Sequence, residues 1–501
     1  MGTWRNNRRA SRRDPAAGAA TPLPWSGPAS TANLRAWYND EDASIASGTD
    51  TTGLYKVANI PNNASASLGG TIAQGTASLQ PKWGSCKGGK ARCWFSSSTL
   101  TSSLAAINYK LKHQFISGCS YAFYFKIRSA ANTNIINTKA SAGTGVGVGT
   151  TVAALNTDNI RVSIGDGTAN QSVDTTSNTL TANVGHSVIV RLSQTEANKV
   201  EIFIDGISAG SATSLTIAPS ASNPGATLSL TNAFAFVDSY MLWETYMPDA
   251  DIPRIHTWLM DRYGQELTTM ADAVTFAATM VNPPAEMYSF NVSGIVNNLA
   301  AHAATGVGSP TTSTNASYNS KYVFDCGTGK YYTANTLSTN MSGTDKPQGY
   351  IVVGNQATTD TTNKTLCSTG SSLGANNQHK RLEFSSGNVT RIHSADDAGG
   401  TDTDAGATAV GTGAVICGAA RYGTTANAWL GLVLELSEAT NDVGATTVDL
   451  FTLFALVQAG ALASSTELNG KAAAAFVWDA KAPNEAVYRT FHAGLKAEFA
   501  L

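Results

Sequence analysis

The sequence predicts an all-β fold of two tandem antiparallel β-sandwich domains, each closed by a short C-terminal α-helix, with an extended arm at the N-terminus. Three observations predict this fold. Short apolar or alternating runs stand between turn residues along most of the chain, as in β-sandwiches. Only 14% of the residues are charged, against ~25% in typical soluble domains. Finally, one strand–loop–helix passage occurs twice.

The repeated passage spans residues 240–263 (YMLWETYMPDADIPRIHTWLMDRY) and returns 235 positions later, at the C-terminal end of the sequence. At that offset Trp243 falls on Trp478, and Pro248 falls on Pro483. Each copy is about as long as one all-β sandwich domain. We therefore expect an arm at 1–30, one domain at 31–265, a linker at 266–285 and a second domain at 286–501.

The arm is rich in arginine in its first half and in Pro, Ala and Gly in its second half. Such a segment cannot bury a core of its own, so it is expected to be extended. Guanidinium groups pair well with carboxylates, which predicts that the arm anchors the chain to an acidic partner surface. The arginines are Arg5, Arg8, Arg9, Arg12 and Arg13.

The first domain contains four clear strand segments, at 121–127 (YAFYFKI), 160–164 (IRVSI), 187–192 (SVIVRL) and 200–204 (VEIFI). Asp166-Gly167 and Asp205-Gly206 are typical of hairpin turns. A final strand at 241–243 precedes a helix that ends at Gly264. Its apolar positions, which follow helical spacing, are Ile252, Ile255, Leu259 and Tyr263. We expect this helix to seal an open end of the sandwich.

The second domain repeats the pattern after a connector that closes with Pro283-Pro284. Its strand segments are predicted at 322–325, 350–353, 382–384, 414–417, 428–436 and 449–457. Its closing helix has apolar residues at Val487, Phe491, Leu495 and Phe499. The predicted order of elements is thus the same in both domains.

These motifs resemble the concanavalin A-like lectin/glucanase (LamG-like) jelly rolls, and most closely those of bacteriophage virion proteins. The residues that carry the resemblance are 34–44 (LRAWYNDEDAS), 200–210 (VEIFIDGISAG) and 322–332 (YVFDCGTGKYY). Cys326 departs from the Phe-Asp-Gly pattern in the last of these. The resemblance covers residues 34 to 501 and specifies a fold more than a function.

No catalytic set is visible in the sequence. Glycosidases on such sandwiches place two carboxylates into one groove, but the Glu-x-Asp-x-x-Glu pattern is missing. Glu201, Asp205 and Glu435 are partial candidates. Asp205 is better explained as a turn residue, and Glu435 is a lone carboxylate in an apolar strand. We therefore expect a protein that is not an enzyme.

Two kinds of binding site remain open. Lectin-like sandwiches often bind Ca²⁺ through loop carboxylates, which makes Asp40, Asp42, Asp396 and Asp397 candidates, although solvated acidic turns are the favoured explanation of these residues. Aromatic and basic residues in the loop 81–95 (PKWGSCKGGKARCWF) are typical of a glycan site. The glycan candidates are Trp83, Trp94, Lys87 and Lys90, while Trp94 in the core is the alternative.

The net charge of −2 disfavours nucleic-acid binding. No apolar run is long enough for a membrane helix, and the six cysteines are expected to be reduced. The function expected from sequence is a virion structural protein, such as a phage head decoration, fibre or collar component. Its partners would be other virion proteins and further copies of the chain. The alternative function is an adhesin for host surface glycans. A polysaccharide depolymerase is the third hypothesis.

Overall fold

The structure is a computed structural model, and it describes most of the chain after residue 32. The described residues are 33–39, 44–45, 57–64, 71–76, 79–85, 91–95, 100–103, 118–127, 132–139, 147–156, 158–175, 180–215, 227–230, 235–264, 267–280, 283–299, 302–334, 341–344, 346–358, 362–371, 379–395, 401–422, 425–438, 445–446, 448–458, 461–463, 466–479, 483 and 485–501. The predicted arm at 1–30, with its five arginines, lies outside them.

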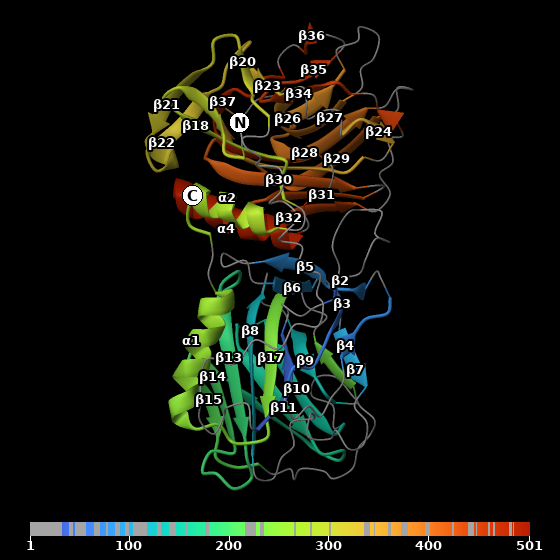
Figure 1. The fold of residues 1–501 in the computed structure, drawn as a ribbon, viewed down its shortest axis with the longest axis vertical. Coiled ribbons are helices and arrows are strands. Elements are labelled where there is room, and N and C mark those ends of the chain that lie inside the picture. Colours follow the sequence, from blue (N-terminus) through green and yellow to red (C-terminus); the bar gives the residue numbers. More distant parts are fainter. Residues whose placement is uncertain are drawn as a thin grey trace, which may run out of the picture. The chain divides into compact units, whose positions relative to one another are not determined.

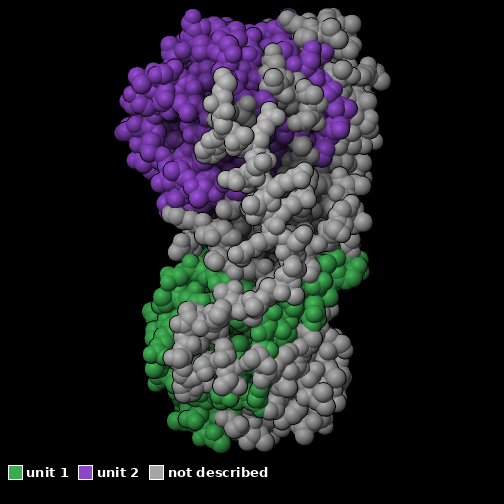
Figure 2. All heavy atoms as spheres, viewed as in Figure 1, with its two compact units in different colours: residues 1–47, 55–265 green, residues 48–54, 266–501 purple. Residues whose placement is uncertain are grey.

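The chain is an all-β protein of two compact units, with the boundary between residues 265 and 266 (Figure 2). Each unit holds two antiparallel sheets whose facing sides share one hydrophobic core. In the first unit the core joins Tyr121 and Phe123 of one sheet to Val152 and Val162 of the other. The predicted β-sandwich fold is confirmed.

The first sheet of the first unit is built around the last strand before the helix. Its strands are β1 (Leu34–Tyr38), β5 (Lys82–Ser85), β6 (Ala91–Phe95), β8 (Cys119–Ile127), β13 (Gly185–Leu192), β14 (Val200–Ile204), β15 (Ile207–Ala212) and β17 (Ala235–Trp243). The order is β15-β14-β13-β8-β17-β6-β5, and β1 also pairs with β17. The predicted strands at 121–127, 187–192 and 200–204 all lie in this sheet.

The second sheet of the first unit has the order β12-β11-β10-β9-β16-β7-β4-β3-β2. Its strands are β2 (Ser44–Ile45), β3 (Val57–Ile60), β4 (Ile72–Ala73), β7 (Leu100–Ser103), β9 (Thr133–Asn137), β10 (Gly149–Ala154), β11 (Ile160–Gly165), β12 (Asn170–Asp174) and β16 (Thr227–Leu230). The predicted strand at 160–164 is β11.

Helix α1 (Ile252–Tyr263) does not seal an end of the sandwich, as the sequence led us to expect. It lies on the outer face of the first sheet (Figure 1), where Ile255 and Leu259 pack in one cluster with Tyr124 and Trp243. Every residue of β8 and β17 is buried, because these strands have the core on one side and the helix on the other. Three buried aliphatic residues of α1 together contribute several kcal/mol, at ~1.5–3 kcal/mol each.

The second unit repeats the plan of two antiparallel sheets, but these sheets hold nine and seven strands, where those of the first unit hold eight and nine. The strands of its first sheet are β18 (Glu286–Asn291), β19 (Gly294–Asn297), β21 (Thr311–Asn315), β22 (Lys321–Asp325), β25 (Gln348–Gln356), β30 (Val415–Tyr422), β31 (Thr425–Leu430), β32 (Val433–Glu438) and β37 (Gly470–Trp478). The final strand β37 pairs with β25 on one side and with β18 and β22 on the other. In the first unit β17 pairs with β8, β1 and β6 in the same way.

The second sheet of the second unit has the order β20-β23-β34-β26-β27-β28-β29. Its strands are β20 (Thr305–Val307), β23 (Tyr331–Thr333), β26 (Lys364–Gly370), β27 (His379–Phe384), β28 (Val389–Ala395), β29 (Thr401–Ala409) and β34 (Leu450–Leu453). Two short pairs complete the unit, β24 (Gly343–Thr344) with β33 (Ala445–Thr446) and β35 (Val457–Gln458) with β36 (Ala461–Leu462).

Two helices cover the outer face of the first sheet in this unit. Helix α4 (Glu485–Phe499) packs against the sheet, and α2 (Met270–Thr279) packs against α4 through Phe276 and Phe491 (Figure 1). Residues 266–285, expected to be a linker, therefore contain a helix, and its residues Ala273 and Phe276 belong to the hydrophobic cluster that α4 forms with the sheet. Thr269 caps α2 by accepting a hydrogen bond from the backbone N–H of Asp272.

Both predicted hairpin turns join neighbouring strands, β11 to β12 through residues 166–169 and β14 to β15 through Asp205-Gly206. Asp205 and Gly206 both have positive φ and join β14 to β15 in a two-residue turn, as predicted. The run at 428–436 is not one strand, because Gly431 turns the chain between β31 and β32 with a φ of 56°. Among the described residues, Cys119, Cys326, Cys367 and Cys417 are free thiols. None of the described helices is both long and apolar enough to cross a membrane.

Candidate functional site

The two faces of each sandwich have different surroundings. The outer face of the first sheet carries apolar residues and is covered by helices. The outer face of the second sheet carries polar residues, since its apolar side chains, such as Val162 and Ile392, point into the core. A cross-strand row of hydrogen-bonding side chains occupies this second face in both units, and we call each one a polar row.

The first polar row crosses five neighbouring strands, β16, β9, β10, β11 and β12. Its members pair directly across the strands and are Ser229, Asn137, Thr151, Ser163 and Ser172. The Thr151 hydroxyl donates to Asn137 Oδ1 at 2.8 Å, and the hydroxyls of Ser163 and Ser172 are 2.6 Å apart. The side chains therefore face one side of the sheet and contact one another.

The second polar row crosses β34, β26, β27, β28 and β29 at equivalent positions. Its members are Thr452, Ser368, Arg381, His393 and Thr403. The hydroxyls of Ser368 and Thr452 are 2.6 Å apart, and Arg381 Nη2 lies 2.8 Å from His393 Nδ1. When the two units are compared, Thr151 corresponds to Arg381, and Ser163 corresponds to His393.

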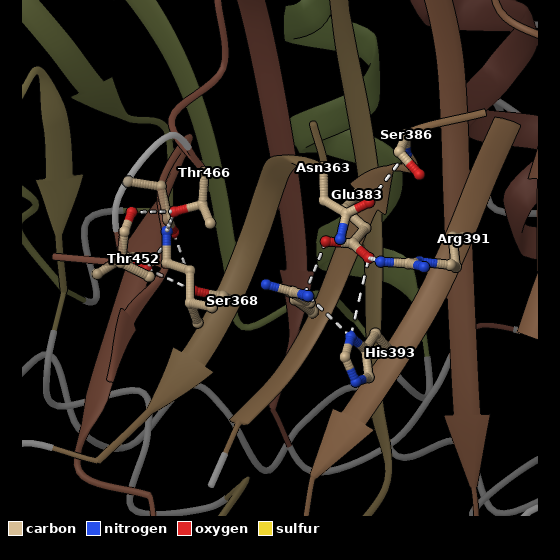
Figure 3. A network of polar contacts seen from close by, with 12 residues as sticks. Asn363, Ser368, Glu383, Ser386, Arg391, His393, Thr452 and Thr466 are labelled. Atoms are coloured by element: carbon tan, nitrogen blue, oxygen red, sulfur yellow. Dashed lines mark hydrogen bonds and ion pairs between the residues drawn. The ribbon is translucent and has the colours of Figure 1, made fainter. Parts of the chain in front are cut away.

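Charged residues flank the second polar row. Glu383 is fully buried and makes ion pairs with Arg381 and Arg391, while His393 Nδ1 lies 3.9 Å from its carboxylate (Figure 3). Burial raises the pKa of Glu383, and the two guanidinium groups act in the opposite direction. The same burial lowers the pKa of Arg381. The pair is held together in a region with little access for water.

His393 is a neutral imidazole in this cluster. Burial and the neighbouring Arg381 lower its pKa to about 3. Arginine can only donate, so His393 Nδ1 accepts from Arg381 and the ring proton lies on Nε2. Nε2 is buried and has no hydrogen-bond partner in the described part of the chain. The ring of His379 packs edge-on against it, with ring centroids 4.8 Å apart.

The first polar row has a balanced pair of charges beside it. Arg161 of β11 lies opposite Asp174 of β12 and donates to its two oxygens at 2.7 and 2.6 Å. Lys139 is 3% exposed and donates to Asn170 of β12 at 2.6 Å. Burial lowers the pKa of Lys139 to about 8.

Lys139 gives a testable pH dependence. Its amine has an ordinary pKa of 10.5, so between pH 8 and that value the unfolded chain binds more protons than the folded chain. The free energy of unfolding should therefore rise with pH across this window, by on the order of 1–3 kcal/mol, and this contribution is lost as pH falls through about 8. Urea unfolding of the wild type and Lys139→Met at both ends of the window measures it. Equal pH slopes in the two proteins would contradict the assignment.

The glycan candidates from sequence fall on β5 and β6. Trp83 pairs with Cys93, and Trp94 pairs with Lys82. The side chains of both tryptophans lie outside what the structure describes, as do Lys87 and Lys90. These four residues therefore stay a prediction.

The candidate calcium ligands Asp40, Asp42, Asp396 and Asp397 also lie outside the described residues. Within the part of the chain that is described, no group of three or more His, Cys, Asp or Glu side chains is arranged to hold a metal ion.

The carboxylates weighed as catalytic are each held in structural contacts. Glu201 is buried and pairs with Arg191, and it accepts hydrogen bonds from Asn198 at 2.8 Å and from the Tyr246 hydroxyl at 2.5 Å. Asp205 lies 2.7 Å from His186 Nδ1 and accepts from the backbone of Ser187. Neither carboxylate has a second carboxylate as its described partner, as a glycosidase pair requires.

Glu435 has a different structural contact, between the two sheets of the second unit. Its Oε2 accepts the backbone N–H groups of Ala407 at 2.9 Å and Thr408 at 2.8 Å. These residues lie on β29, the edge strand of the second sheet, whereas Glu435 lies on β32, the edge strand of the first sheet. A Cβ on Gly406 would lie 2.8 Å from Cβ of Glu435, so only glycine fits there without a shift.

The sequence did not reveal the polar rows. Their one signal is an alternation, in which Arg161 and Ser163 flank Val162 on β11, and Arg391 and His393 flank an isoleucine on β28. Such alternation shows that a strand has one polar face. It does not show which side chains from other strands lie beside it, so the rows become visible only with the strand register.

No family of known proteins matches the sequence, and no curated protein matches it. Among solved structures, the chain is similar to the binding domain of Paraclostridial Mosquitocidal Protein 1, at 9% identity and a TM-score of 0.36, over 61% of this chain and 64% of that chain. The chain is also similar to the botulinum neurotoxin serotype C1 binding domain, at 10% identity and a TM-score of 0.31, over 93% of this chain and 98% of that chain. A third similar structure is the Ruminococcus gnavus IT-sialidase CBM40 bound to alpha2,3 sialyllactose, at 12% identity and a TM-score of 0.26, over 30% of this chain and 83% of that chain. The fold assignment therefore rests on the strand pairing of the chain itself.

Proposed function

We propose that this chain is a non-enzymatic glycan-binding protein that uses the polar row of each unit. The observation that carries the proposal is the recurrence of the row on the same outer face in both units. Strands lie about 4.8 Å apart, so the members of each row recur at regular intervals across its sheet. Ser172 and Thr403, at one end of the rows, are exposed, whereas Thr151, Ser163, Ser368 and Thr452 are buried. Hydroxyl, amide and guanidinium groups in such an array suit the hydroxyls of a saccharide.

Two features of the rows support binding over catalysis. The described carboxylates beside them, Asp174 and Glu383, are each paired with arginine, and neither has a second carboxylate among its described partners, as a glycosidase pair requires. The duplication also supports a binding protein, because two sites on one chain raise avidity for a repeating polymer without any new contact.

The proposal is tested by displaying the full chain on an array of plant, animal and bacterial polysaccharides. We expect the double variant Ser172→Ala/Thr403→Ala, which removes the exposed hydroxyl at the end of each row, to bind the recognised glycan roughly 2- to 10-fold more weakly per hydrogen bond lost. Ser211→Ala, an exposed serine on the edge strand β15, serves as the matched control and should bind normally. The proposal fails if the folded chain binds no glycan, or if the double variant and the wild type bind equally.

A place in a phage particle remains a separate proposal from the sequence, supported by the five arginines of the arm. Particle incorporation of a chain that begins at residue 31 would test it. Loss of incorporation with both sandwiches folded is the expected result, and normal incorporation would reject the anchoring role.

A further inference from the structure

The two polar rows differ in charge at equivalent positions. The pairing of β10 with β11 matches that of β27 with β28, so Arg161 corresponds to Arg391 and Ala153 corresponds to Glu383. In the first unit Arg161 has its own carboxylate, because Asp174 accepts two hydrogen bonds from it.

In the second unit, a single carboxylate faces two guanidinium groups. Glu383 pairs with both Arg381 and Arg391, and His393 beside them carries no charge near neutral pH. Among the described residues of the second polar row and its flanks, one positive charge is therefore left unbalanced. Poor access of water makes this charge act more strongly than it would at an open surface.

The same cluster presents an unused donor. The His393 ring proton lies on Nε2, and this N–H has no acceptor among the described residues. A buried donor without an acceptor is unfavourable, and a hydrogen bond to an oxygen atom of a ligand would remove this cost. The side chains of His393 and Arg391 are 17% and 16% exposed, whereas Glu383 beneath them is fully buried. A ligand would therefore meet Arg391 and His393 first.

We propose that the second polar row binds the carboxylate of an acidic saccharide, with Arg391 and the Nε2–H of His393 as its donors. The proposal rests on the glycan-binding function above and assigns its ligand class in one unit. Guanidinium and carboxylate groups match in charge and in planar geometry. The first unit does not repeat this pair of donors, because Arg161 is held by Asp174 and Ser163 stands at the position of His393.

The test compares two probes that differ only in charge, tetragalacturonate and its methyl ester, by calorimetric titration of the full chain. The wild type should bind the free acid about tenfold more tightly than the ester, as for one hydrogen bond between charged groups. Arg391→Gln should abolish that preference. The matched variant Arg161→Gln, at the equivalent position of the first unit, should keep it.

His393→Ser provides a second variant that leaves the pairing of Glu383 with its arginines intact. The first unit has a serine, Ser163, at the equivalent position. The variant should bind the acid several-fold more weakly than the wild type, and its unfolding curve should match that of the wild type. Retention of the preference in folded Arg391→Gln and His393→Ser would overturn the inference. So would equal binding of acid and ester, tighter binding of a sulfated galactan than of galacturonate, or equally tight binding of polyglutamate.

These outcomes are distinct from failure of the proposed function. Glycan binding on the array without any acid preference rejects only the carboxylate site. A folded chain that binds neither the array nor the two probes rejects both proposals.

Discussion

Replacing Glu383 with alanine is expected to lower the free energy of unfolding of the second unit by about 3–5 kcal/mol. The carboxylate is fully buried and pairs with Arg381 and Arg391. Its loss leaves two guanidinium groups close together with no counter-charge among their described ion-pair partners. Removing one partner of a buried ion pair lowers the free energy of unfolding strongly, because the remaining charge stays desolvated. Urea unfolding followed by circular dichroism measures the change.

Glu435→Ala is the matched control for this experiment. Glu435 also lies in a strand of the second unit, but it accepts only two backbone N–H groups and neutralises no described cation. Its replacement should cost about 1–3 kcal/mol. A loss in Glu383→Ala no larger than that in Glu435→Ala would show that the arginines reach solvent once the carboxylate is gone.

Phe491→Ala should also destabilise the second unit by about 3–5 kcal/mol, the usual range for a fully buried phenylalanine. Its ring centroid lies 5.1 Å from those of Phe276 and Phe476, and 5.8 Å from that of Trp478. The side chain thus joins α2, α4 and β37, and its removal leaves a cavity among three aromatic rings. Thermal or urea unfolding measures the loss, and hydrogen exchange should show α2 opening more readily than the sheets.

Two further variants sharpen the result. Phe491→Leu keeps most of the volume and should cost less than about 1.5 kcal/mol. Val292→Ala, at a side chain that is 75% exposed, should stay within about 0.5 kcal/mol of the wild type. An unfolding curve for Phe491→Ala that matches the wild type would mean that α4 does not contribute to the cooperative unit.

The strands were predictable from sequence where apolar and polar residues alternate or where a short apolar run stands between turns. The position of the helices was not predicted, although a signal exists. The end of β17 reads YMLW and the end of β37 reads AFVW, so apolar residues occupy both faces. A strand that is apolar on both faces needs a cover on each side. This signal places α1 and α4 on the sheet and not at its end.

The candidate site was less accessible to sequence reasoning. Arg381, His393 and Ser368 lie on three different strands, and only the register brings them together. A shift of one residue would turn each of them into the core. The sequence instead drew attention to tryptophans and loop carboxylates, since these residue types stand out without any knowledge of their neighbours.

The contact between Glu435 and the edge strand β29 also affects how molecules of this protein meet. The free amides of an edge strand are templates for pairing with a strand of another molecule. Glu435 occupies two of them, at Ala407 and Thr408, and Gly406 gives it the space to do so. Copies held close together, on a particle or along a polysaccharide, would find these two amides closed to strand exchange. The carboxylate thus protects this part of the edge strand from pairing with a strand of another copy.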